Sequence, residues 1–133
     1  MLKLITNTMT KTIAAVGIST TTLVSGVIVN GGAGQGIAAA IPLIGGQGLR
    51  PNASALAAYI RGTYPGVLSI GGVRQDRLPD HPSGHALDIM IGSNTALGDT
   101  IAADVRAQSS RFGMKYLLWR VTAHFDHVHV TVL

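Results

Sequence analysis

The sequence predicts a small α+β domain over residues 49–133, with two helices and an antiparallel sheet of about four strands. Two segments, 53–62 and 96–112, carry apolar residues at helical spacing. Four other segments are apolar or alternate between apolar and polar residues, as strands do: 67–74, 85–91, 116–122 and 127–133. Because the last two strands are close in the sequence, we expect them to pair antiparallel.

Local signals support each element in order. Pro51 and Asn52 favour the start of the first helix, and a Tyr-Pro-Gly turn at 64–66 follows it. The first strand ends in two glycines, Gly71 and Gly72, which predict a close backbone approach. A polar loop over 75–84 leads to the second strand. Ser93 or Asn94 can cap the long helix, and Gly113 predicts its end.

The first 40 residues have the pattern of an export signal. Lys3 and Lys11 are the charged residues there, residues 13–29 are uncharged and mostly apolar, and alanines occupy 38–40. We predict a cleaved signal peptide at 1–40 and a flexible leader at 41–48. The alternatives for 1–40 are a retained anchor, or a segment that is neither signal nor anchor. The protein would be secreted or associated with the cell wall, and would touch a membrane only through an uncleaved N-terminal segment.

The composition limits the chemistry that the domain can use. There is no cysteine, so the chain forms no disulfide and any metal site must use His, Asp or backbone ligands. From Ile41 onward, eight Lys/Arg face six Asp, a net charge of +2. This charge is too small to predict binding to nucleic acid.

The histidines point to a metal site. All five lie between 81 and 129, in two groups that also contain aspartates: His81, His85, His124, His127 and His129. On an extended strand, His127 and His129 share one face while Val128 and Val130 face the core. Two imidazoles and one carboxylate form a common catalytic zinc shell because they leave a fourth position for water.

The motifs resemble those of a known group of enzymes. The segment 81–88, His-Pro-Ser-Gly-His-Ala-Leu-Asp, resembles the His-x-x-Gly-x-Ala-x-Asp signature of the zinc D-Ala-D-Ala carboxypeptidases and L-Ala-D-Glu endopeptidases. Asp-His-Val-His at 126–129 resembles the acid-x-x-His element of that group, whose fold is shared with Hedgehog domains. More narrowly, residues 49–133 are similar to small actinobacterial secreted domains of this type.

The resemblance implies roles for individual residues. It makes His81, Asp88 and His129 the ligands of one Zn²⁺ ion. Asp126 would be the catalytic acid/base, and His127 would orient water or stabilise charge. Arg74 would face the substrate carbonyl, with Arg77 as its competitor.

Several other residues receive expectations. We predict that partial burial against Phe125 and Trp119 raises the pKa of Asp126, which would make it a better base. Trp119 is also expected in the core. Among the remaining polar residues, we expect His85 to point away from the site and His124 to be structural or to support the ligands. Asp80 would either orient His81 or cap the loop.

Three functions follow from the resemblance. The first is a zinc-dependent peptidase that cuts peptidoglycan stem peptides and acts as a monomer. The second is a non-catalytic module of the same fold, in which the metal stabilises a wall-binding domain. The third is a phage-derived lysin fragment with the first chemistry. The connection 120–126 is shorter than in larger relatives. Three interpretations stay open: an open groove, a large substrate, or a loss of activity.

Overall fold

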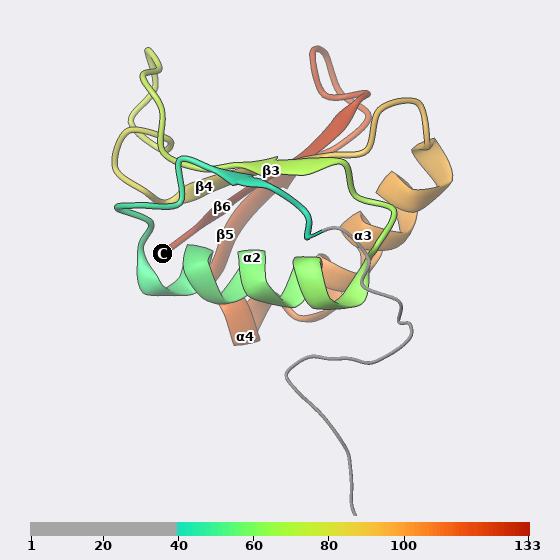
Figure 1. Cartoon of the computed structure of the whole chain (residues 1–133), viewed down its shortest axis with the longest axis horizontal. Helices are drawn as coiled ribbons and strands as arrows, with labels where there is room; N and C mark the ends of the chain where they lie inside the picture. The colour runs from blue at the N-terminus through green and yellow to red at the C-terminus, as the bar shows by residue number, and fades with distance from the viewer. Residues whose placement is uncertain (1–39) are drawn as a thin grey trace, which may run out of the picture. The chain divides into compact units, whose positions relative to one another are not determined.

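The computed structural model describes residues 40–133 (Figure 1). Except for Ala40, the predicted signal segment 1–40 lies outside the described residues. The described part is an α+β domain, which confirms the predicted class. Its helices are α2 Pro51–Thr63, α3 Thr95–Ala107 and α4 Ser109–Phe112; its strands are β2 Leu43–Ile44, β3 Ser69–Gly71, β4 Ala86–Met90, β5 Met114–Leu118 and β6 His127–Val132.

The strands form one sheet in the order β2-β3-β4-β6-β5. All neighbours pair antiparallel except β2 and β3, which are parallel. The predicted antiparallel pair at the end of the chain is therefore confirmed. In the centre of the sheet, β4 and β6 align so that Asp88 lies directly opposite His129.

Two expectations about the elements are wrong. Residues 41–48, predicted as a flexible leader, contribute β2 to the sheet edge: Ile70 N donates to Pro42 O at 2.9 Å, and Ile41 is buried. These hydrogen bonds to β3 hold the segment although its glycines predict a loop. The helix predicted over 96–112 is divided into α3 and α4 at Gln108, so residues 40–133 contain three helices and five strands.

The helices cover one face of the sheet (Figure 1). Alternate residues of the two central strands point into this core and are fully buried: Leu87, Ile89, Val128 and Val130. Their neighbours Asp88 and His129 point to the other face. The strand alternation therefore separates a packed side from a polar side, and the polar side carries the candidate site.

Each longer helix begins where the sequence predicts. Pro51 occupies the first turn of α2, where a missing N–H does no harm. The Asn94 side chain caps α3 by accepting a hydrogen bond from Leu97 N at 3.1 Å. The two helices have 13 residues each, and no helix within residues 40–133 is long and apolar enough to cross a membrane.

The connection between β5 and β6 is held by α3. Trp119 is buried, as predicted, and its indole packs against Gly98, where a side chain would overlap it. The Asp99 carboxylate accepts hydrogen bonds from Trp119 Nε1 at 2.8 Å and from Arg120 at 2.8 and 2.9 Å. One side of the candidate site is thus anchored to the start of α3.

Candidate metal centre

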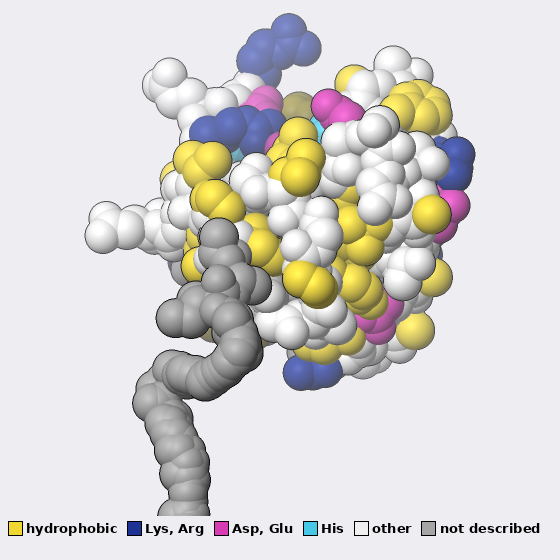
Figure 2. All heavy atoms as spheres, turned by 45° about the vertical axis from the view of Figure 1, so that its right-hand side comes forward, with side chains coloured by type: hydrophobic (Ala, Val, Ile, Leu, Met, Phe, Trp, Pro, Cys, Tyr) yellow, Lys and Arg dark blue, Asp and Glu magenta, His cyan; other side chains and the backbone are white. Residues whose placement is uncertain are grey.

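The polar face of the sheet carries a cavity of about 320 Å³. It lies between the loop 75–84 and the connection 119–126, which are the two projections on the upper side of Figure 1. Four of the five histidines line it: His81, His124, His127 and His129. In Figure 2, histidine appears only as small areas near the top, beside basic and acidic side chains.

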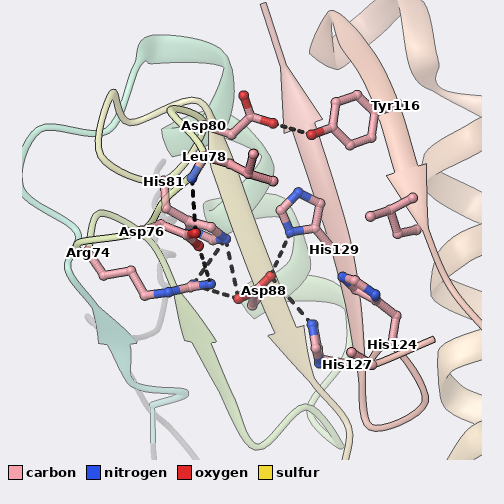
Figure 3. A pocket seen from close by; sticks show the side chains of 12 residues that line it. Arg74, Asp76, Leu78, Asp80, His81, Asp88, Tyr116, His124, His127 and His129 are labelled. Carbon is pink, nitrogen blue, oxygen red and sulfur yellow. Dashed lines mark hydrogen bonds and ion pairs between the residues drawn. The ribbon is translucent and has the colours of Figure 1, made fainter. Parts of the chain in front are cut away.

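Asp88 lies at the centre of this cavity (Figure 3). Its Oδ1 is 2.8 Å from His129 Nδ1, and its Oδ2 is 3.3 Å from His81 Nε2. Arg74 Nη1 donates to the same Oδ2 at 2.7 Å. Burial raises the pKa of Asp88, but these hydrogen bonds outweigh burial and hold the pKa far below its usual range. Asp88 is therefore a carboxylate at neutral pH.

His81 is fixed by the backbone of a neighbouring strand end. It is 2% exposed, and its Nδ1 is 2.8 Å from the Gly72 carbonyl oxygen. A carbonyl only accepts hydrogen bonds, so Nδ1 carries a proton and the neutral ring presents Nε2 as a lone pair. Burial lowers the pKa of His81, but the hydrogen bonds to Asp88 and Gly72 outweigh burial, so the net shift is upward.

His129 lies on β6 and faces Asp88 with Nδ1, whereas His81 faces it with Nε2. His129 Nδ1 faces Asp88 Oδ1, while its Nε2 is 3.0 Å from the Thr131 hydroxyl oxygen. The side chain is nearly buried, and the ring of His81 meets it edge-on with centroids 5.2 Å apart. The two imidazoles therefore converge on one carboxylate from opposite sides.

These three residues fit a metal ion. One ligand atom from each of His81, Asp88 and His129 can be chosen so that all lie within 4.8 Å of one another. In the described structure the cationic Arg74 guanidinium lies beside both His81 and Asp88, with Nη1 3.0 Å from His81 Nε2 and 2.7 Å from Asp88 Oδ2. Two nitrogens and one carboxylate, without thiolate, suit zinc and other divalent transition metals. The predicted ligand trio is thus brought together in a geometry that could hold an ion.

The two candidate arginines, Arg74 and Arg77, lie in different hollows of the surface. Arg74 lines the cavity, and its Nη1 lies 3.0 Å from His81 Nε2 as well as 2.7 Å from Asp88. Its Nη2 donates to Asp76 at 3.1 Å, and 47% of its side chain is exposed. Arg77 contributes to a separate surface hollow with Gln75 and Pro82. Of the two, Arg74 is the arginine that reaches the candidate ligands.

Asp126 and His127 form a pair at the edge of the site. His127 lines the cavity, and its Nε2 is 3.7 Å from Asp88 Oδ1. Its Nδ1 is 2.8 Å from Asp126 Oδ1, so the carboxylate lies behind the ring. The prediction that burial raises the pKa of Asp126 is wrong: 65% of the side chain is exposed, and the hydrogen bond from His127 lowers this pKa.

Several side chains at or behind the cavity lie outside the predicted ligand and catalytic set. His124 lines the cavity, and Tyr116 and Thr131 both donate hydrogen bonds to the Asp80 carboxylate. The Tyr116 hydrogen bond lowers the pKa of Asp80. The Asp80 side chain is thus connected to His129 through Thr131, whereas one of its two predicted roles was to orient His81. Thr131 could have been found, because it follows His127 and His129 at the same two-residue spacing.

Comparison with known proteins places the domain in a family. A family model described as "VldE, C-terminal domain" matches residues 45–126, more than half of the chain. The chain belongs to the VldE C-terminal domain family. No curated protein and no solved structure matches it significantly.

The VldE match includes two of the candidate ligands and ends just before the third. His81 and Asp88 lie inside the matched range, whereas His127 and His129 on β6 follow its last residue, Asp126. The pairing of β4 with β6 nevertheless brings His129 opposite Asp88. In this VldE domain, the sheet thus brings the three candidate ligands together.

Gly84 shapes the loop that carries His81. Its φ of +81° lies in the left-handed region, and a Cβ there would overlap the Gly48 carbonyl oxygen. We expect Gly84→Ala to lower the free energy of unfolding by about 3 kcal/mol, as urea denaturation would measure.

A matched control is Gly62→Ala in α2, where a new Cβ meets nothing within 4 Å. This substitution should stabilise the protein by up to about 1 kcal/mol, because alanine favours a helix. Equal stability of the two variants would show that the loop tolerates a side chain at Gly84.

Proposed function

We propose that this VldE domain is an exported zinc-dependent peptidase that hydrolyses peptidoglycan stem peptides. One observation carries the proposal: a candidate ligand trio, a histidine and an arginine line a single cavity, and an aspartate outside the cavity hydrogen-bonds that histidine. The trio is His81, Asp88 and His129, and the remaining groups are Asp126, His127 and Arg74. Metal-dependent hydrolysis of an amide needs these three functions together.

Three further points support the choice of substrate. The VldE family is related to D-Ala-D-Ala carboxypeptidase-like proteins that act on peptidoglycan. The motifs at 81–88 and 126–129 resemble those of the zinc peptidases that share the Hedgehog fold. The predicted export signal would deliver the domain to the cell wall, where such peptides are found.

Zinc, when bound by the trio, would polarise the scissile carbonyl and lower the pKa of its water to about 7. His127 is placed to accept a proton from the attacking water, because Asp126 holds its Nδ1–H and leaves Nε2 free toward the cavity. The same nitrogen would return the proton to the leaving amine. We therefore assign the base to His127, and Asp126 becomes the residue that orients it.

Arg74 would stabilise the negative charge that develops on the substrate oxygen. Its guanidinium already lies beside the ligands, and nearly half of its side chain is exposed. An arginine donates up to five hydrogen bonds and keeps its charge at any physiological pH. Since Nη1 bonds two candidate ligand atoms, metal binding would turn this group toward the substrate.

The surroundings suit an extended peptide. Leu78, on the loop 75–84, lines the cavity and is 66% exposed. Leu118 and Ala123 line the cavity on the side of the connection 119–126, so apolar side chains border its polar floor. An extended chain could lie across the floor with apolar contacts at both edges.

The test is hydrolysis of purified stem peptides, including cross-linked dimers, by the zinc-loaded protein. We expect cleavage products by mass spectrometry, loss of activity with a chelator, and recovery when zinc is returned. Zinc-loaded protein that cleaves none of these peptides would contradict the proposal. Binding to intact cell walls without cleavage would instead support the non-catalytic module.

A further inference from the structure

A chain of hydrogen bonds continues behind the candidate ligand His129. Its Nε2 is 3.0 Å from Thr131 Oγ1, and Thr131 donates to Asp80 Oδ2 at 3.0 Å. Tyr116 donates to the same Asp80 oxygen, as Figure 3 shows. We propose that Asp80 and Thr131 are positioning residues, which keep the His129 proton on Nε2 and so present Nδ1 to the metal.

The donor and the acceptor of each hydrogen bond in this series follow from the protons available. A carboxylate only accepts hydrogen bonds, and a threonine hydroxyl has one proton to donate. Thr131 gives this proton to Asp80, so its oxygen must accept the bond from His129. Nε2 of His129 therefore carries hydrogen, and Nδ1, which faces Asp88 Oδ1 at 2.8 Å, is the ring nitrogen left for a metal ion to bind.

In the other three histidines of the cavity, Nδ1 is the ring nitrogen that faces a hydrogen-bond acceptor outside the candidate ligands. An oxygen acceptor holds Nδ1 in each of them: the Gly72 carbonyl for His81, the Thr122 carbonyl for His124, and the Asp126 carboxylate for His127. All three present Nε2 to the cavity. His129 differs because an oxygen faces both of its ring nitrogens: Asp88 Oδ1 at Nδ1 and Thr131 Oγ1 at Nε2. The contact with Thr131 occupies Nε2, so a metal ion would bind His129 at Nδ1.

Thr131 has an unusual place for a polar residue. It is 1% exposed, and it lies on β6 opposite Ala86, between the core residues Val130 and Val132. A buried hydroxyl destabilises a fold unless it is hydrogen-bonded, so without such bonds a valine would pack there more favourably. The two hydrogen bonds explain why a hydroxyl occupies this position.

The inference rests on the part of the proposed function that gives His129 to the metal, and it does not depend on hydrolysis. Outer hydrogen-bond partners of metal-ligating histidines fix the ring nitrogen that is free, and their loss typically weakens metal affinity 10- to 100-fold. Both the ring tautomer and the affinity are measurable without a substrate.

The experiment compares Thr131→Val with Thr131→Ser. Zinc affinity is measured by competition with a chromophoric chelator, and the His129 tautomer by long-range ¹H–¹⁵N correlation NMR of the protein before zinc is added. We expect Thr131→Val to bind zinc about 10- to 100-fold more weakly and to lose the Nε2–H form. Thr131→Ser should restore both, because it keeps the hydroxyl.

Asp104 provides a matched control for Asp80. It also accepts two hydroxyl hydrogen bonds, from Tyr59 and Tyr64, but it lies between α2 and α3 and outside the cavity. Asp104→Asn should lower the melting temperature with wild-type zinc affinity, whereas Asp80→Asn should weaken zinc binding.

The outcomes separate the two proposals. Wild-type protein that binds no zinc would refute the metal site, and the NMR comparison would still test the tautomer. Wild-type affinity and an unchanged His129 tautomer in both Thr131→Val and Asp80→Asn would overturn the positioning role. If Thr131→Val does not fold, Asp80→Asn and Thr131→Ser still decide the question.

Discussion

His81→Ala should lose zinc under conditions in which the wild-type protein retains about one ion per chain. Zinc sites in small domains supply about 10–16 kcal/mol of binding free energy, so one of three protein ligands should account for roughly 3–5 kcal/mol. The affinity should therefore fall more than about 100-fold. Elemental analysis after dialysis against a weak chelator would measure the ion content.

His85→Ala is the matched control for this measurement. His85 is only four residues further along, but its ring is bonded to Ser83 and does not line the cavity of the trio. This agrees with the prediction that it points away from the site. The control variant should keep its zinc. Retention of a full zinc equivalent by His81→Ala would remove this residue from the ligand set.

His127→Ala should lower turnover of a stem peptide by about 10²- to 10⁴-fold, the usual contribution of a general base. Zinc content should stay at the wild-type value, because His127 is outside the ligand trio. The loss should appear mainly in kcat, since the proton transfer takes place in the transition state. Steady-state kinetics on one defined peptide would provide the comparison.

Asp126→Asn tests whether His127 or Asp126 is the general base. If Asp126 only holds the ring of His127, both variants should lose activity, and the double variant should be little worse than either single one. If Asp126 were itself the base, His127→Ala would keep substantial turnover while Asp126→Asn would lose it. Activity retained by both single variants would exclude the pair from the reaction.

Much of the site could be predicted because strand alternation is a local property. His127 and His129 share one face of β6, and Val128 and Val130 are buried on the other, as the sequence indicates. The two longer helices also begin at or within two residues of the predicted positions, because Pro51 and Asn94 act through their immediate neighbours.

The features that were missed depend on contacts between distant segments. The edge strand β2 contains few residues and adjoins glycines, and only its pairing with Ile70 and Gly71 makes it a strand. The exposure of Asp126 depends on how α3 holds the connection 119–126. Likewise, Tyr116 reaches Asp80 because β5 pairs with β6, and this register cannot be read from either strand alone.

The opposition of Asp88 and His129 on neighbouring strands has a consequence for the lifetime of the folded domain. An ion bound there would join residues 41 positions apart in the sequence, much as a cross-link does in a chain without cysteine. A ligand present at 1,000 times its dissociation constant adds about 4 kcal/mol to the stability of the folded state. In zinc-poor surroundings the domain would unfold more often and be degraded by neighbouring proteases, so metal supply would set how long it persists.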